Sequence, residues 1–169
     1  MLKVLVPVDG SSNSRHAVRH VVSEFQSNPA IDIHLLNVQP PFSRYISRFV
    51  DRKTIKDVQN EESEKALRLV RQKLDAAGVP YAVHVGVGER AALIAQSAQR
   101  LHCDHIVMST TRKNSLTRLF EDSVTNKVLE LTTVPVVVIA GDAASKAERY
   151  GIPAGVGTGL AWLAVSAAE

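Results

Sequence analysis

Hydrophobic residues follow two alternating patterns along the chain. Short apolar runs rich in Val, Ile and Leu recur at residues 2–8, 31–38, 81–85, 106–108 and 134–139. Runs of this length between turn residues predict buried β-strands. Between the runs, apolar residues recur three and four positions apart, which predicts amphipathic helices over 17–25, 66–77, 91–101 and 124–131. Every segment between two strands is long enough for the crossover that parallel pairing requires.

This alternation predicts an α/β fold: a doubly wound, open, parallel, five-stranded sheet of Rossmann-like type with helices on both faces. The strands are continuous apolar runs, as expected when helices cover both faces. Ligands of such sheets bind at the carboxyl ends of the strands, near the topological switch point. We therefore expect a site at Asp9 and Gly10, at Val38 and Gln39, and just after Met108.

Local signals support the predicted helix boundaries. The polar cluster 11–14 can cap the first helix, and Asn28-Pro29 can end it. Gly78 follows the second helix as a C-terminal stop.

The length of 169 residues suits one domain and a tail. We expect the domain to occupy residues 1–140 and the tail 141–169. The tail reads as a linker followed by a short apolar segment, residues 160–165, which packs on its own domain or on a partner subunit. No apolar run approaches the roughly 18 residues of a membrane span, and Asp9-Gly10 comes too early for a signal peptide. The expected location is the cytoplasm.

Charge and cysteine content narrow the class further. The formal net charge is only +3, and the basic residues form no single strong patch, so no specific nucleic-acid binding is expected. Cys103 is the single cysteine, so no intrachain disulfide can form, as in a reducing compartment. Cys103 has His102 and His105 nearby, but we interpret it as buried structure.

Four separated segments, in order, resemble the universal stress protein family. They are Val4–Ser11, Leu36–Val38, Cys103–Met108 and the stretch from Val107 to Ile139 with its Pro-Val-rich end. In that family the fourth strand ends in a loop of pattern G-x2-G-x9-G-(S/T), and a helix and a last strand follow. The resemblance covers residues 1 to about 140 and implies the sheet described above.

The resemblance also implies a homodimer. The last predicted strand is apolar throughout, and an uncovered apolar edge invites aggregation. In the family, two copies pair through their last strands, which here places Val136, Val137, Val138 and Ile139 in the dimer interface.

For a member that binds ATP, the resemblance implies adenine between Asp9 and Val38, with the phosphates on the glycine-rich loop and the start of the fourth helix. Glycine loops and helix N-termini offer free N–H donors to an anion. The candidate nucleotide-binding residues are Asp9, Val38, Met108, Ser109, Arg112, Asp122, Ser123 and Val124.

The chain departs from the glycine pattern at three positions, which carry Ser109, Arg112 and Asp122, while Ser123 matches. Side chains there narrow the pocket and restrict the backbone. Asp122, with Glu121 beside it, places a carboxylate where the fourth helix begins and the phosphates would lie. Arg112 and its basic neighbours oppose this effect, because their positive side chains could hold a phosphate from the side.

The sequence therefore favours a dimeric stress-response regulatory or binding module without tight ATP binding. The alternative is an ATP-binding universal stress protein that acts as a nucleotide-dependent switch or slow ATP hydrolase. An adenylating enzyme is less consistent, because no phosphate-loop motif follows the first strand. No catalytic constellation stands out, and we expect no catalytic residues and no enzyme activity.

Two further patterns leave alternatives open. Basic residues recur every fourth position in segment 42–56, interleaved with aromatic and aliphatic residues. If helical, this segment has two possible roles. It could dock another protein or an anionic surface, or it is a solvated helix whose apolar side covers the mouth of the sheet. His16 and His20 have metal-ligand spacing, but Arg15 and Arg19 beside them disfavour a cation, so no metal is expected.

Overall fold

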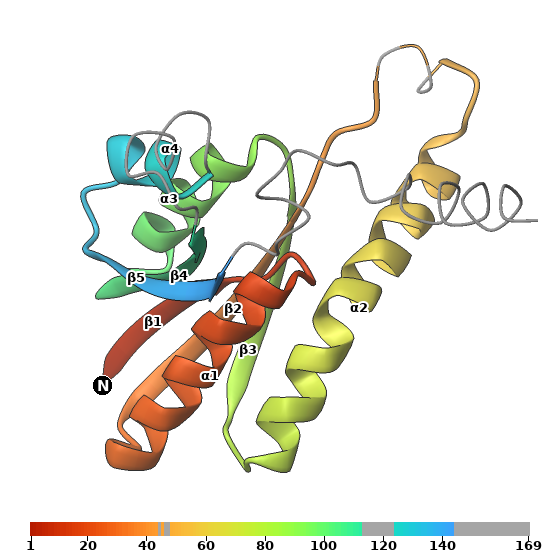
Figure 1. The fold of residues 1–169 in the computed structure, drawn as a ribbon. Helices are drawn as coiled ribbons and strands as arrows, with labels where there is room; N and C mark the ends of the chain where they lie inside the picture. The colour runs from red at the N-terminus through yellow and green to blue at the C-terminus, as the bar shows by residue number, and fades with distance from the viewer. Residues whose placement is uncertain (44, 46–47, 113–123, 144–169) are drawn as a thin grey trace, which may run out of the picture.

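The computed structural model describes residues 1–43, 45, 48–112 and 124–143, with backbone only for residues 111, 112, 142 and 143. Within this part, five parallel strands alternate with four helices around one sheet (Figure 1). The elements are β1 (Leu2–Pro7), α1 (Ser12–Ser27), β2 (Ile31–Gln39), α2 (Arg52–Ala76), β3 (Tyr81–Val87), α3 (Arg90–Arg100), β4 (His105–Arg112), α4 (Val124–Leu131) and β5 (Val136–Ala143). The predicted α/β fold is confirmed.

The strand order β3-β2-β1-β4-β5 places the topological switch point between β1 and β4. The chain moves outward from β1 to β3 and then crosses back to the other side of β1. β1 pairs with β2 along its whole length, from Leu2 opposite Ile31 to Pro7 opposite Leu36. Its described pairing with β4 is limited to Val4 opposite His105 and Leu5 opposite Ile106. Beyond Leu5 these two strands separate, which opens a crevice at their carboxyl ends.

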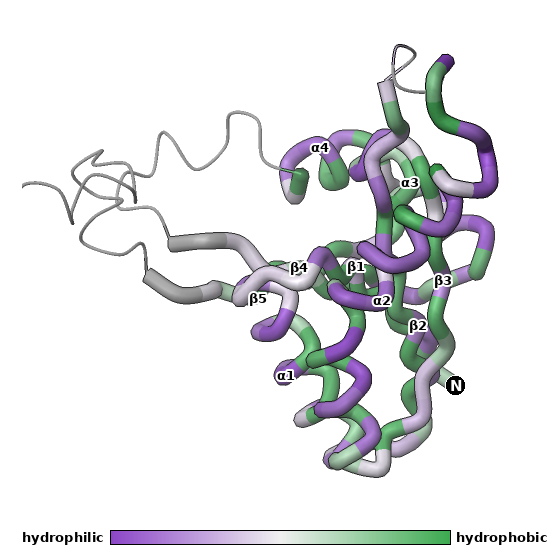
Figure 2. The backbone as a smooth tube through the Cα atoms, turned by 90° about the vertical axis from the view of Figure 1, so that its right-hand side faces the viewer, coloured by the Kyte–Doolittle hydropathy of each residue, from purple (hydrophilic) through white to green (hydrophobic). Residues whose placement is uncertain are grey.

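Each face of the sheet carries its own hydrophobic core. On one face, Val4 and Val6 pack with Val18 of α1 and Leu67 of α2. On the opposite face, Leu5 and other strand residues pack with α3 and α4. Successive residues of a strand point to opposite faces, so a strand covered on both sides is apolar at every position. Figure 2 shows hydrophobic and hydrophilic residues alternating along the helices.

The predicted helix signals act as expected. The Ser11 hydroxyl caps α1 by accepting the Ser14 N–H at 3.2 Å, and Asn28 ends the helix. Gly78 adopts φ of +64° directly after α2, a conformation that glycine adopts without strain.

Two strands are longer than predicted. β4 continues past Met108 to Arg112 and β5 continues to Ala143, so residues predicted as a loop after Met108 and as a linker from Gly141 belong to the sheet. Thr110 pairs with Ala140 and Arg112 with Ala143, with an irregularity between Thr110 and Arg112. In β4, β-branched threonines favour extended backbone, and no glycine stands between Ser109 and Arg112 to turn the chain.

The second helix also begins earlier than its apolar periodicity indicates. α2 starts at Arg52, where the carboxylate of Asp51 accepts the Thr54 N–H at 2.9 Å. Within the described residues of segment 42–56, the α-helix begins at Arg52. Residues 52–62 include no buried side chain, and Ser63 is the first one in α2. The beginning of α2 therefore projects from the domain (Figure 1).

No helix in the described part of the chain is long and apolar enough to cross a membrane. Residues 113–123 and 144–169, which contain the predicted positions Asp122 and Ser123 and the apolar segment 160–165, lie outside the described residues.

Candidate functional site

Two adjoining cavities lie at the carboxyl ends of the strands. The larger, about 590 Å³, lies between the end of β2 and α2; the smaller, about 260 Å³, lies between the ends of β1 and β4. Asp9, Val38 and Arg90 line both of them. The two cavities therefore form one crevice at the switch point, where ligands of this sheet type bind.

The structure brings most of the described candidate residues together. Around the smaller cavity lie Asp9, Val38, Met108, Ser109 and Val124. Arg112 is the last residue of β4, and the residues that follow it, 113–123, lie outside the described part of the chain. Asp122 and Ser123 fall outside the described residues.

Asp9 lies in the turn between β1 and α1. Its Oδ1 accepts the Ser11 N–H at 3.0 Å, which holds the carboxylate at the mouth of the crevice. Burial acts to raise the pKa of Asp9, but hydrogen bonds from Ser11 and Ser14 outweigh it, and the pKa lies below its ordinary value. Asp9 is therefore ionised near neutral pH. It can accept N–H or O–H groups of a ligand, and it repels phosphate.

Gly10 brings the same turn against α2. Its φ is +80°, and a Cβ there would lie 3.1 Å from the Ala66 Cα. A side chain at this position would therefore be strained and crowded by backbone. Arg15 Nη1 donates to the Gly10 carbonyl at 3.2 Å, which fixes the turn from the side of α1.

A buried amide fixes the floor of the larger cavity. Asn37 Nδ2 donates to the Val8 carbonyl at 2.7 Å. Asn37 Oδ1 accepts from Ser63 Oγ at 2.9 Å and from Gln39 Nε2 at 2.8 Å. One side chain thus ties β2 to the end of β1 and to α2. Sequence analysis did not assign this role, although a polar residue inside the apolar run 31–38 is a signal for it.

Glu89 and Arg90 lie at the start of α3, just after β3. The Glu89 carboxylate caps α3 by accepting the Ala91 N–H at 3.2 Å and the Ala92 N–H at 2.6 Å. The hydrogen bonds from Ala92 and Ala91 lower the pKa of Glu89. These α3 amides are therefore already occupied by a carboxylate of the chain itself, not free for a ligand anion.

Arg90 is the functional candidate that sequence analysis missed. It is exposed, it lines both cavities, and its guanidinium makes no ion pair with any residue that the structure describes. Its position directly after the third strand, at the carboxyl edge, is the signal that could have found it.

β5 lies tightly against β4 at Ser109 and Thr110. A Cβ on Gly141 would lie 2.9 Å from the Thr110 carbonyl and 3.1 Å from Ser109 Oγ, and would also meet Asn13. Ser109 Oγ is itself buried and has no hydrogen-bond partner among the described residues. The backbone at Ser109 is therefore extended and packed closely against β5, and it does not form a turn.

Several carboxylates surround the crevice. Asp9 and Glu62 line the larger cavity, and Lys65 beside them is paired with Glu61 at 3.0 Å and Glu62 at 2.9 Å. The crevice thus offers hydrogen-bond acceptors for the polar edge of a small ligand. For a phosphate chain, the described residues offer one unpaired cation, Arg90, and no glycine loop.

Comparison with known proteins gives a consistent result. A model of the universal stress protein family matches residues 1–140. Universal stress protein MJ0531 of Methanocaldococcus jannaschii is 29% identical over 140 residues, which are 81% of each chain. Among solved structures, hypothetical protein MJ0577 is similar with a TM-score of 0.66 and 25% identity, covering 82% of this chain and 94% of that one. A universal stress protein family protein from Arabidopsis thaliana with AMP bound has a TM-score of 0.59 and 19% identity, covering 83% and 92%.

Proposed function

Because the chain belongs to the universal stress protein family, we propose that it is a dimeric stress-response regulatory module whose crevice does not bind ATP tightly. The observation that carries the proposal is the course of β4. Two of the three positions that hold glycine in the family pattern, Ser109 and Arg112, lie on this strand. In this proposal, the protein acts on its targets by contacting other proteins.

The physical reason concerns the backbone amides. In a glycine loop, consecutive N–H groups point at the phosphates. In β4, Ser109 is paired with Ile139, and Thr110 with Ala140. Backbone held in register with β5 is not arranged to cradle a phosphate. The lowered pKa of Asp9 adds a negative charge at the mouth of the crevice, which acts in the same direction.

The exposed edge of the sheet supports the proposed dimer. β5 is the last strand of the order, and the side chains of Val137 and Val138 are 36% and 43% exposed. Val136 and Ile139 are partly buried against the domain's own cores. Pairing with β5 of a second copy would satisfy the free backbone groups of this edge and cover the two exposed valines.

The second candidate function is an ATP-binding switch or slow ATP hydrolase. Two observations favour it: five of the eight candidate residues line the smaller cavity, and the Arabidopsis thaliana relative has AMP bound. In this case the Arg90 guanidinium would take the place of the backbone N–H donors that a glycine loop offers to a phosphate.

Restoring the glycine pattern separates the two. The triple variant Ser109→Gly, Arg112→Gly and Asp122→Gly frees the backbone at all three positions and removes the acid. If the missing loop limits binding, calorimetry should find ATP affinity at least about tenfold above wild type, equivalent to about 1.4 kcal/mol. The single variant Arg90→Gln is the control: it should leave wild-type behaviour unchanged. Wild-type binding that is tight, and is lost in Arg90→Gln, would favour the second candidate.

A further inference from the structure

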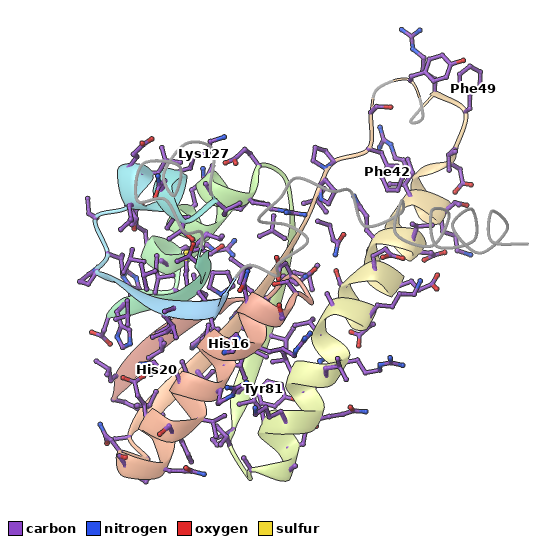
Figure 3. All side chains as sticks on the ribbon, in the orientation of Figure 1. His16, His20, Phe42, Phe49, Tyr81 and Lys127 are labelled. Atoms are coloured by element: carbon purple, nitrogen blue, oxygen red, sulfur yellow. The ribbon has the colours of Figure 1, made fainter. Side chains whose placement is uncertain are left out.

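The loop after β2 and the beginning of α2 form a projecting tip beyond the carboxyl edge of the sheet (Figures 1 and 3). Tyr45 and Phe49 lie in this loop with side chains 73% and 75% exposed. Their rings are tilted against each other, with centroids 5.2 Å apart. The tip is defined here by six residues: Tyr45, Arg48, Phe49, Arg52, Lys53 and Lys56.

The aromatic residues of this loop divide into two groups. Phe42 is half-buried and lines the larger cavity together with Val58. Tyr45 and Phe49 line neither cavity, and Phe49 lies at the far end of the projection in Figure 3. The position of Phe42 is explained by its contact with the crevice. The exposure of Tyr45 and Phe49 is not, because leaving two large apolar rings in water costs free energy unless a partner covers them.

Positive charge is concentrated around the aromatic pair. Arg48, Arg52, Lys53 and Lys56 are all exposed, and none makes an ion pair with a carboxylate within the described ranges. Two acids accompany these cations in the sequence: Asp57 is exposed, and Asp51 is committed to capping α2, where it accepts from Thr54 N at 2.9 Å and from Thr54 Oγ1 at 2.7 Å. Its charge is therefore held against the helix amides and only partly offsets the cations.

Behind the tip, α2 carries acidic residues beside its basic ones. The turns after the tip carry Glu61, Glu62 and Glu64, which pair with Lys65 and Arg71. These ion pairs offset the acids behind the tip, whereas the tip cations have no such partners among the described residues. An anionic surface would therefore attract the tip more strongly than the part of α2 that follows it.

We propose that the tip docks this protein onto an anionic phospholipid surface. Aromatic rings partition into the interfacial region of a bilayer, and surrounding cations are attracted by anionic headgroups. A convex apex can reach a flat surface without rearrangement of the domain. An acidic protein would use the same cations, but it would have to supply a groove for the two exposed rings.

The test is co-sedimentation of the full chain with vesicles of phosphatidylcholine alone and of phosphatidylcholine mixed with phosphatidylserine. Binding is expected only to the mixed vesicles, and it should weaken as salt is raised, because exposed charges are screened. Each basic residue removed from the tip should lower the partition coefficient about fivefold. The double variant Tyr45→Ala, Phe49→Ala should lower it about tenfold or more without changing the net charge.

Matched controls lie elsewhere on the surface. Arg19→Gln with Arg68→Gln removes two exposed cations outside the tip, and Leu69→Ala removes a side chain that is 50% exposed. These variants should bind as wild type does. All tip residues are exposed, so circular dichroism should show native spectra for the tip variants.

Three results would overturn the proposal. The first is no binding to the mixed vesicles at low salt. The second is equal binding to both vesicle types. The third is a combination of two observations: immobilised polyglutamate captures the wild-type protein, and the Tyr45→Ala, Phe49→Ala variant binds vesicles as well as wild type does. Together they would assign the tip to an acidic protein partner.

Discussion

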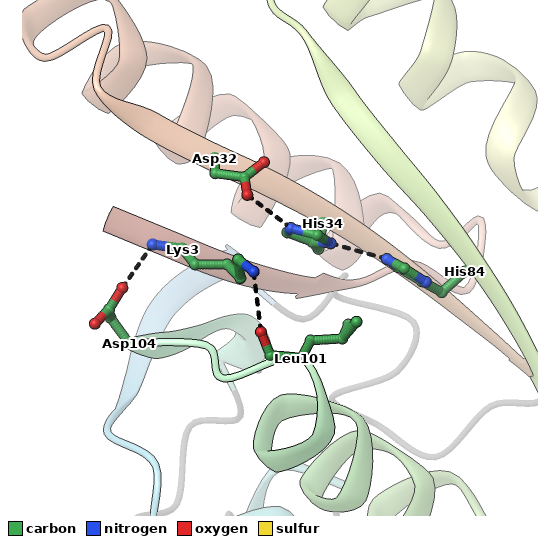
Figure 4. Close-up of polar contacts among 6 residues, drawn as sticks. All are labelled: Lys3, Asp32, His34, His84, Leu101 and Asp104. Carbon is green, nitrogen blue, oxygen red and sulfur yellow. Dashed lines mark hydrogen bonds and ion pairs between the residues drawn. The ribbon is translucent and has the colours of Figure 1, made fainter. Parts of the chain in front are cut away.

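Two histidines on neighbouring strands share a hydrogen bond. His34 Nδ1 lies 2.8 Å from His84 Nε2, and His34 Nε2 lies 3.0 Å from Asp32 Oδ2 (Figure 4). Because an ionised carboxylate only accepts hydrogen bonds, His34 donates from Nε2 and accepts from His84 at Nδ1 when both rings are neutral. This chain of contacts links β2 to the edge strand β3.

This pair should make stability depend on pH. Burial, followed by the charges of His34 and Arg100, lowers the pKa of His84. Below about pH 6.5 the unfolded chain therefore takes up a proton that folded His84 resists, so stability should fall as pH decreases from about 7 to about 5. His84→Gln retains a donor toward His34 but does not titrate. Urea denaturation at a series of pH values should show a shallower decline for this variant.

A control histidine lies at the end of α3. His102 is exposed and has φ of 53°, a conformation that asparagine tolerates. His102→Asn should leave the pH dependence of the wild-type protein unchanged. A decline that is equally steep in His84→Gln would assign the pH dependence to other groups.

Among the elements, β4 and β5 are extended and paired where sequence analysis predicted a loop and a linker. They depend on close approach at Gly141, where a Cβ would contact the Thr110 carbonyl at 2.9 Å. Because the neighbouring atom is backbone, it cannot move aside as a flexible side chain can. The two extended strands can thus lie this close together only because residue 141 has no side chain.

Gly141→Ala should therefore destabilise the protein. Overpacking of this kind costs about 1–3 kcal/mol, which corresponds to a fall in Tm of roughly 2 °C or more for a chain of this size. The control is Gly86→Ala, where the added Cβ meets only the mobile Leu93 Cδ1 at 3.3 Å. Differential scanning calorimetry should find a much smaller change there. Equal Tm values for the two variants would contradict the tight packing of β5 on β4.

Periodicity predicts an element well where one side of it faces a core. Residues 124–131 alternate with the helical period, and α4 has these bounds in the structure. The first turns of α2 have no buried stripe, so no periodicity reveals them, and their start depends on the Asp51 cap. The ends of β4 and β5 depend on each other across the sheet, and such pairing is not visible in either segment alone.

For the whole molecule, strand order decides which residues meet. The α/β alternation placed the crevice at the carboxyl ends of the strands, and Asp9, Val38, Met108, Ser109 and Val124 do converge there. Asn37 and Arg90 act through contacts with distant elements, which local patterns do not contain.

Assembly through β5 is the prediction at this scale. Light scattering after size exclusion should give twice the monomer mass, because an open apolar edge favours pairing. Val138→Lys places a charge beside that edge and should shift the protein to the monomer. Leu69→Lys, at a position that is 50% exposed on α2, should remain dimeric. A wild-type monomer at micromolar concentration would exclude this interface.

The most direct measurement of the central claim is a calorimetric titration of the wild-type protein with ATP and magnesium. Since β4 is a paired strand at Ser109 and Asp9 is ionised, we expect no saturable heat at micromolar ATP. Saturable binding in the micromolar range would contradict a crevice without tight ATP binding and establish a nucleotide-dependent member of the family.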